Sequence, residues 1–149
     1  MASPQTKGPA RVFIDSSVLY AAALSPTGPA RRLILKGFEE EITLFISDLV
    51  LEETERNLQL KAPQALPLFS IFCSLLYPNL THATKAAVLR AARIVHSKDA
   101  PIVAAAARVK AEYLATHDLR HLLSHREEIE NSYGIKVLTP GELLSLAPN

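Results

Sequence analysis

The stretch VFIDSSVLYAAALSPTGPARRLIL, residues 12–35, decides the fold class of this sequence. Its first three residues form an apolar run that ends at Asp15, which is typical of a short buried strand. Residues 16–24 then favour a helix, the turn residues 25–28 end it, and Pro29 begins a second helix. A strand followed directly by helices is the repeating unit of a parallel α/β sheet.

The rest of the chain continues this alternation. Further strands are predicted at residues 42–46, 78–81, 113–116 and 135–138. Further helices are predicted at 29–36 with Gly37 at the end, 47–60, 63–77, 84–95, 99–109, up to Tyr133 before Gly134, and 140–146. The pattern indicates one α/β domain over residues 11–146, with a largely parallel sheet covered on both faces and a flexible arm at residues 1–10.

Composition narrows the class of protein. The chain has 149 residues, a formal net charge of +1 and 48% hydrophobic residues, which fits one globular domain and argues against a general nucleic-acid coat. Its one cysteine, Cys73, excludes a disulfide framework, and we interpret it as core packing. Residues 1–10 lack the apolar run of a signal peptide, and the apolar segment 65–77 is too short to span a bilayer. We therefore expect a cytoplasmic protein with no membrane segment.

Four acidic residues carry the chemical signal, because each lies at or near the start of a predicted helix: Asp15, Glu53, Asp99 and Asp118. In a parallel α/β sheet these helix starts gather at the carboxyl edge, where open α/β folds bind their ligands. Carboxylates that converge repel one another unless a cation offsets them, and oxygen ligands suit Mg²⁺ or Mn²⁺. The pattern predicts metal-assisted attack of water on a phosphodiester. Taken singly, each acid is also explained as a helix cap or a charge near a helix start.

Four motifs, in order along the chain, resemble those of the PIN domains, single-domain nucleases found as ribonuclease toxins of toxin–antitoxin pairs. They are VFIDSSVLYAAALSPTGPARRLIL, then ISDLVLEETERNL at 46–58, KDAPIVAAA at 98–106 and YLATHDLRHLL at 113–123. The resemblance covers about residues 11–143. It implies a three-layer α/β/α PIN-like fold with a central, mostly parallel sheet, a site for Mg²⁺ or Mn²⁺, and an endoribonuclease that leaves 5′-phosphate and 3′-hydroxyl ends.

The resemblance also implies roles for individual residues. Asp15, Asp99 and Asp118 would be metal ligands, and Glu53 would ligate the metal or orient its water. Ser16 or Ser17 would hydrogen-bond near Asp15, and Thr116 would orient Asp118 or contact the phosphate. The implied partners are RNA, a protein antitoxin and a second copy of the chain in a homodimer.

Two positions depart from the family pattern. Arg120 stands where many relatives have a further acid, and Ser17 replaces the commoner Asn. A site that is less negative suits one metal rather than two. Arg120 is also the favoured phosphate contact, followed by the pair Arg31 and Arg32. Arg90, Arg93 and Lys98 form another basic cluster, and all of these are alternatively ordinary solvated side chains.

The sequence leaves other readings open. His117, His121 and His125 recur every four residues, and one helical face with this spacing could bind Zn²⁺, although the only carboxylate partner in view is Asp118. A catalytically silent module of the same fold that binds RNA or protein is the alternative function, supported by Arg120. A third possible function is that of a phosphotransfer protein of another α/β class. Phosphatases of the haloacid dehalogenase type, however, need a second Asp at the position that Ser17 occupies.

Overall fold

The computed structural model describes residues 8–146, which form a five-stranded, wholly parallel sheet with the strand order β3-β2-β1-β4-β5. The strands are β1 (Ala10–Ile14), β2 (Ile42–Ser47), β3 (Leu80–Thr81), β4 (Tyr113–Ala115) and β5 (Lys136–Leu138). β1 is central, and its Phe13 pairs with Phe45 of β2 and Leu114 of β4. The prediction that an apolar run ending at Asp15 forms a buried strand is confirmed, since Val12, Phe13 and Ile14 are fully buried.

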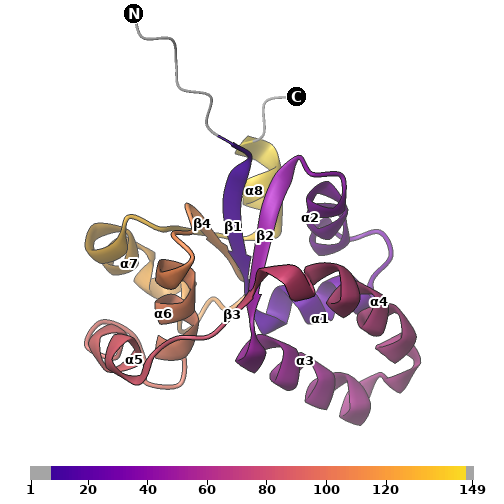
Figure 1. The fold of residues 1–149 in the computed structure, drawn as a ribbon, viewed down its shortest axis with the longest axis horizontal. Coiled ribbons are helices and arrows are strands. Elements are labelled where there is room, and N and C mark those ends of the chain that lie inside the picture. Colours follow the sequence, from indigo (N-terminus) through magenta and orange to yellow (C-terminus); the bar gives the residue numbers. More distant parts are fainter. Residues whose placement is uncertain (1–7, 147–149) are drawn as a thin grey trace, which may run out of the picture.

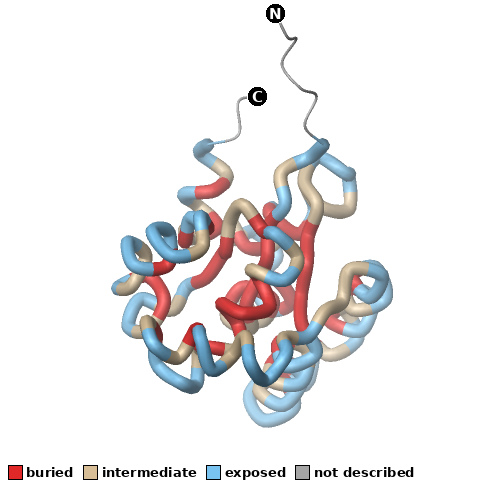
Figure 2. Tube along the Cα trace, turned by 60° about the vertical axis from the view of Figure 1, so that its left-hand side comes forward, coloured by how far each residue is buried: buried red, intermediate tan, exposed pale blue. Residues whose placement is uncertain are grey.

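Helices cover both faces of this sheet (Figure 1). One face carries α1 (Ser16–Leu24), α2 (Pro29–Phe38), α3 (Asp48–Lys61) and α4 (Leu66–Leu76). The other carries α5 (Lys85–Ala91), α6 (Ala100–Arg108) and α7 (Arg126–Tyr133), while α8 (Pro140–Leu146) packs against α2 and β5. This is the expected three-layer α/β/α arrangement, with the buried chain along the central strands and exposed residues on the outer helices (Figure 2).

Short polar side chains cap the starts of α1, α3 and α5. Asp15 accepts a hydrogen bond from the backbone N–H of Val18 and so caps α1. Ser47 and Thr84 cap α3 and α5 in the same way. At the other end of α7, Gly134 adopts a left-handed conformation (φ 70°), which ends the helix where the sequence predicts.

Gly37 lies inside α2, although the sequence predicts that it ends this helix. A Cβ at this position would lie 2.2 Å from Cδ1 of Leu44, a buried side chain of β2. Glycine therefore lets α2 approach the sheet closely and does not act as a helix stop. The two residues after Lys36 remain helical because this packing outweighs the low helix propensity of glycine.

Other boundaries differ from the sequence predictions. The helix predicted at 84–95 ends at Ala91, and turns carry the chain on to the buried Val95. The strand predicted at 78–81 keeps only its last two residues, because 77–79 form a 3₁₀ turn. Ala10, assigned to the arm, begins β1; residues 1–7 of that arm lie outside the described residues.

Within residues 8–146 no helix is long and apolar enough to cross a membrane, since the longest, α3, has 14 residues.

Candidate active site

A pocket of about 720 Å³ lies at the edge of the sheet where the strands end. Residues after β1, along α3, at the start of α6 and after β4 line it. Parallel strands and their crossover helices bring these segments to one edge of the sheet. Its lining is Asp15, Ser16, Ser17, Tyr20, Leu49, Glu52, Glu53, Arg56, Asn57, Lys61, Lys98, Asp99, Pro101, Ile102, Asp118 and His121.

Asp15 is the most buried acid of this pocket, with a relative exposure of 5%. Its Oδ1 accepts hydrogen bonds from Ser17 Oγ at 2.6 Å and from the N–H of Val18 at 3.2 Å, and its Oδ2 accepts one from Thr116 Oγ1. Burial raises the pKa of Asp15 to about 6; the three hydrogen bonds oppose this effect and the charge of Asp118 adds to it. The carboxylate is therefore held in one orientation but carries an electrostatic cost.

Hydrogen bonds also join the ends of β1 and β4. The backbone N–H of Asp15 donates to the carbonyl of Ala115 at 3.2 Å. Ser17 Oγ accepts from the N–H of His117, and Thr116 Oγ1 accepts from the N–H of Asp118, both at 2.9 Å. Thr116, which is fully buried, thus contacts Asp15 and the backbone of Asp118 at once. Of the predicted supporting residues, Ser17 bonds to the carboxylate of Asp15, Thr116 bonds to that carboxylate and to the backbone of Asp118, and Ser16 lines the same pocket.

Asp99, Asp118 and His121 form the tightest group, in which one ligand atom from each lies within 4.8 Å of the others. His121 Nδ1 is 3.6 Å from Asp99 Oδ2 and 3.5 Å from Asp118 Oδ2. Asp118 Oδ1 accepts the backbone N–H of His121 at 3.0 Å, which fixes the turn between them. Burial and, second, the charge of Asp118 raise the pKa of Asp99, while His121, His96 and Lys98 oppose that rise. We call this group the Asp99–Asp118–His121 cluster.

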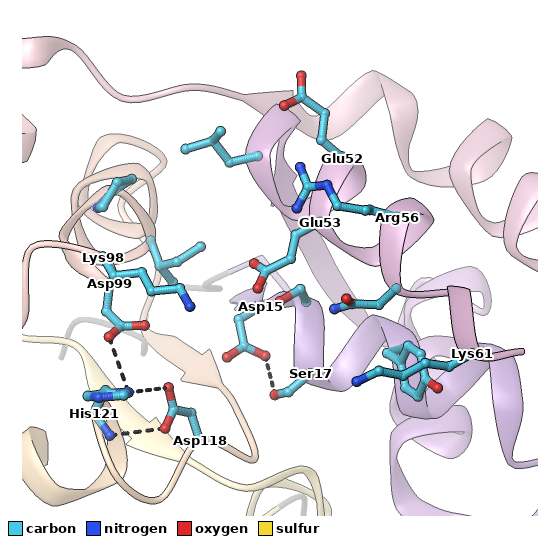
Figure 3. Close-up of a pocket in the computed structure, with 16 residues that line it drawn as sticks. Asp15, Ser17, Glu52, Glu53, Arg56, Lys61, Lys98, Asp99, Asp118 and His121 are labelled. Atoms are coloured by element: carbon cyan, nitrogen blue, oxygen red, sulfur yellow. Dashed lines mark hydrogen bonds and ion pairs between the residues drawn. The ribbon is translucent and has the colours of Figure 1, made fainter. Parts of the chain in front are cut away.

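The four acids predicted from the sequence all line the pocket. In Figure 3 the carboxylates of Asp15, Glu53, Asp99 and Asp118 turn toward a common space, Glu53 reaching in from α3. Asp15 and Glu53 nevertheless lie outside the closely spaced cluster. The structure therefore brings the acids to one pocket; their individual roles remain predictions.

The three arginines favoured from the sequence as phosphate contacts lie elsewhere. Arg31 donates to the carbonyls of Ala22 at 2.5 Å and Ala23 at 3.4 Å, and its guanidinium lies 5.7 Å from the ring centroid of Phe72, so it helps hold α2 and α4 against the end of α1. Arg32 and Arg120 do not line the pocket.

Other basic residues line the pocket, namely Arg56, Lys61 and Lys98. The sequence carried a signal for the first, because Arg56 follows Glu53 by three residues and a helix places these positions on one side. The sequence groups Lys98 with Arg90 and Arg93 in a basic cluster, and only its position next to Asp99 indicates the pocket. The amine of Lys98 points into the space between the acids in Figure 3.

The histidine spacing does not produce a helical face. Residues 117–122 form a loop and turns, and His125 lies in the 3₁₀ segment Leu123–His125, because the backbone of this segment is taken up by the hydrogen bonds of Asp118 and Ser17. Of the three histidines only His121 joins the acids. The prediction of a Zn²⁺ site on one helical face, formed by His117, His121 and His125, is therefore wrong.

The chemistry of the cluster fits a divalent cation. Asp99 Oδ2 is buried and has no hydrogen-bond partner within the protein, and such an atom ordinarily binds a water molecule or an ion. Two carboxylates and one imidazole offer three ligand atoms from two loops, and the pocket leaves room for water and substrate beside them. The mix of acidic and basic groups suits a cation together with an anionic ligand such as a phosphate.

Comparison with known proteins agrees with this arrangement. The family model of the PIN domain matches residues 12–128. Among solved structures, PAE2754 from Pyrobaculum aerophilum resembles this fold with a TM-score of 0.58 and 20% sequence identity, over 93% of this chain and 97% of that one. At that identity the likeness speaks for the fold alone. No curated protein matches the sequence significantly.

The buried carboxylate of Asp15 predicts a pH dependence of stability in the metal-free protein. The unfolded chain releases the Asp15 proton near the ordinary pKa of 3.8, whereas the folded chain holds it up to about 6. The contribution of Asp15 to the free energy of unfolding is thus full below pH 4 and falls, by up to about 3 kcal/mol, as the pH rises through 6. Urea unfolding in EDTA at pH 4 to 8 should show a smaller decline in Asp15→Asn than in the parent.

The matched control is Asp48→Asn, which changes an exposed carboxylate at the start of α3. This variant should follow the pH dependence of the parent. If Asp15→Asn and the parent decline in parallel, the carboxylate of Asp15 carries no such cost.

Proposed function

The chain belongs to the PIN domain family, and on this premise we propose that it is a metal-dependent endoribonuclease that hydrolyses RNA phosphodiester bonds. PIN domains are nucleases and generally depend on a divalent metal. The observation that carries the proposal is the Asp99–Asp118–His121 cluster, which shares one pocket with Asp15 and Glu53. A catalytically silent module would have no need of four carboxylates turned toward a common space at an electrostatic cost.

We propose that Asp15, Asp99 and Asp118 are the ligands of Mg²⁺ or Mn²⁺. Glu53 would be a further ligand or would accept a hydrogen bond from the attacking water. A bound divalent ion supplies positive charge that stabilises the transition state and makes water a better nucleophile. The protein contributes rigidity: Thr116 positions both Asp15 and the loop of Asp118, and Ser17 ties Asp15 to His117. Because these hydrogen bonds are made within the protein, they hold the acids in place for the reaction and limit the reorganisation that catalysis needs.

Water attacks phosphorus and the bond from phosphorus to the 3′ oxygen breaks, which leaves a 5′-phosphate and a 3′-hydroxyl. Three basic residues line the pocket, Arg56, Lys61 and Lys98, and we propose that they contact the phosphates on either side of the scissile bond. The pocket lining does not include Arg31, Arg32 or Arg120. We propose that these arginines contact phosphates farther from the scissile bond. Tyr20 and Leu49, which line the same pocket, offer apolar surface to unstacked bases of a single strand.

We further propose that the protein is the toxin of a toxin–antitoxin pair, acts in the cytoplasm and forms a homodimer. The support for a protein partner is a set of exposed apolar side chains at the end of α3, on α4 and just after it, namely Leu60, Ile71, Leu75 and Tyr77. Sedimentation of the purified chain tests the homodimer, which a mass of 16.3 kDa in solution would contradict.

Removal of one carboxylate of the pocket should abolish cleavage while the fold survives. In Asp99→Asn and Asp118→Asn, the cleavage rate of a fluorescent single-stranded RNA with Mn²⁺ should fall at least about a hundredfold, because several kcal/mol of charge stabilisation is lost. Circular dichroism should show unchanged secondary structure in both variants.

The matched control for this test is Glu55→Gln, which changes an exposed carboxylate on α3 that does not line the pocket. It should cleave at the rate of the parent. If Asp99→Asn and Asp118→Asn also cleave at that rate, the site is wrong; if the parent binds RNA without cutting it, the binding module is the right reading.

The pocket bases predict a local effect on RNA affinity. Arg56→Gln and Lys61→Gln should each weaken binding of single-stranded RNA in EDTA, and should each reduce the slope of log K against log salt by about 0.7, as expected for one lost phosphate contact. Fluorescence anisotropy at several salt concentrations measures both quantities.

Arg108→Gln is the control for charge alone, since Arg108 is exposed at the far end of α6 from the pocket. This variant should keep the slope of the parent. Equal effects of all three substitutions would mean that the pocket does not define the RNA path.

A further inference from the structure

The side chain of His121 lies between two acids of the pocket, Asp99 and Asp118. Its Nδ1 lies 3.6 Å from Asp99 Oδ2 and 3.5 Å from Asp118 Oδ2. These separations are longer than the roughly 2.7–3.2 Å of a hydrogen bond from nitrogen to oxygen. They are short enough for atoms that share one ion, because donors about 2.1 Å from a metal can lie up to about 4.2 Å apart.

The ring of His121 is held in this place by its surroundings. Its backbone N–H donates to Asp118 Oδ1 at 3.0 Å, so the side chains of Asp118 and His121 leave one turn in the same direction. On another side its ring packs against that of His96, with 5.3 Å between the centroids. The Nδ1 atom of His96 is occupied by the backbone N–H of Lys98, at 3.0 Å, which leaves His121 as the histidine whose nitrogen faces the acids.

Asp99 supplies the second, independent observation. Its Oδ2 atom is buried, has no hydrogen-bond partner, and is the atom that faces His121 Nδ1. A buried carboxylate oxygen needs a hydrogen-bond donor or a cation, and the imidazole nitrogen beside it is too far away to donate. A cation shared by the two atoms would satisfy both.

We infer that His121 is a nitrogen ligand of the bound metal and that it makes this site prefer Mn²⁺ to Mg²⁺. The inference rests on the divalent-metal site of the proposed function and adds its ligand set and its ion selectivity. Mg²⁺ favours oxygen ligands almost exclusively, whereas a first-row transition ion gains from an imidazole. The opposing reading is that His121 serves only as a positive charge between Asp99 and Asp118.

Pulsed electron paramagnetic resonance of bound Mn²⁺ separates these readings, because directly coordinated imidazole nitrogen adds a ¹⁴N modulation to the echo. The full chain, stripped with EDTA and loaded with Mn²⁺, should show this modulation. It should be lost in His121→Asn and retained in His82→Asn, the matched control at an exposed histidine that does not line the pocket. Circular dichroism checks that both variants fold.

Calorimetric titration gives the selectivity. In His121→Asn the affinity for Mn²⁺ should fall about tenfold or more, the size of loss expected when a residue of a metal site is removed. The affinity for Mg²⁺ should change less than about threefold, because Mg²⁺ gains little from an imidazole ligand. Equal losses for both ions, Mn²⁺ bound to the parent without ¹⁴N modulation, or modulation that survives in His121→Asn would each overturn the inference.

Cleavage of RNA by the parent is measured separately. A parent that cuts RNA but shows no nitrogen coupling refutes the role of His121 and leaves the nuclease in place. A parent that shows the coupling but never cuts RNA refutes the nuclease and leaves the metal ligand in place.

Discussion

The hydrogen bond from Thr116 to the buried carboxylate of Asp15 is the contact on which the site depends. Asp15 follows β1, and Thr116 follows β4, the neighbouring strand in the sheet. Thr116, after β4, thereby orients the carboxylate of Asp15, after β1. The same hydroxyl accepts a hydrogen bond from the backbone N–H of Asp118. A parallel sheet only brings strand ends to one edge. The first hydrogen bond orients the carboxylate of Asp15, and the second one fixes the backbone from which Asp118 extends.

Charge is the second constraint on this edge of the sheet. The structure gathers Asp15, Glu53, Asp99 and Asp118 in one pocket, and burial raises the pKa of Asp15 and of Asp99. The surrounding hydrogen bonds and the basic groups Lys98 and His121 offset only part of that cost. A cation and an anionic substrate offset the rest. The same arrangement that destabilises the protein by itself therefore favours ligand binding.

The sequence was sufficient for the features that depend on local pattern. The buried β1, the caps at Asp15 and Ser47, the stop at Gly134 and the convergence of four acids follow from apolar runs, cap residues and the rules of parallel sheets. The family match to residues 12–128 agrees with the resemblance seen in the four motifs.

Features that depend on distant partners could not be predicted from local pattern. Gly37 sits inside α2 because of Leu44 on another element, and Arg31 is drawn to the carbonyls at the end of α1. The spacing of four residues groups His121 with His117 and His125 on a helical face, but the hydrogen bonds of Asp118 form a turn there instead of a helix. The relevant signal was the spacing of three residues from Asp118 to His121.

One measurement tests the central claim, that these side chains share a cation, most directly. Crystals of the chain soaked in Mn²⁺ and examined at the manganese absorption edge should show an anomalous peak within bonding distance of carboxylate oxygens of Asp99 and Asp118. Ordered carboxylates at millimolar Mn²⁺ with no such peak between them would contradict the account.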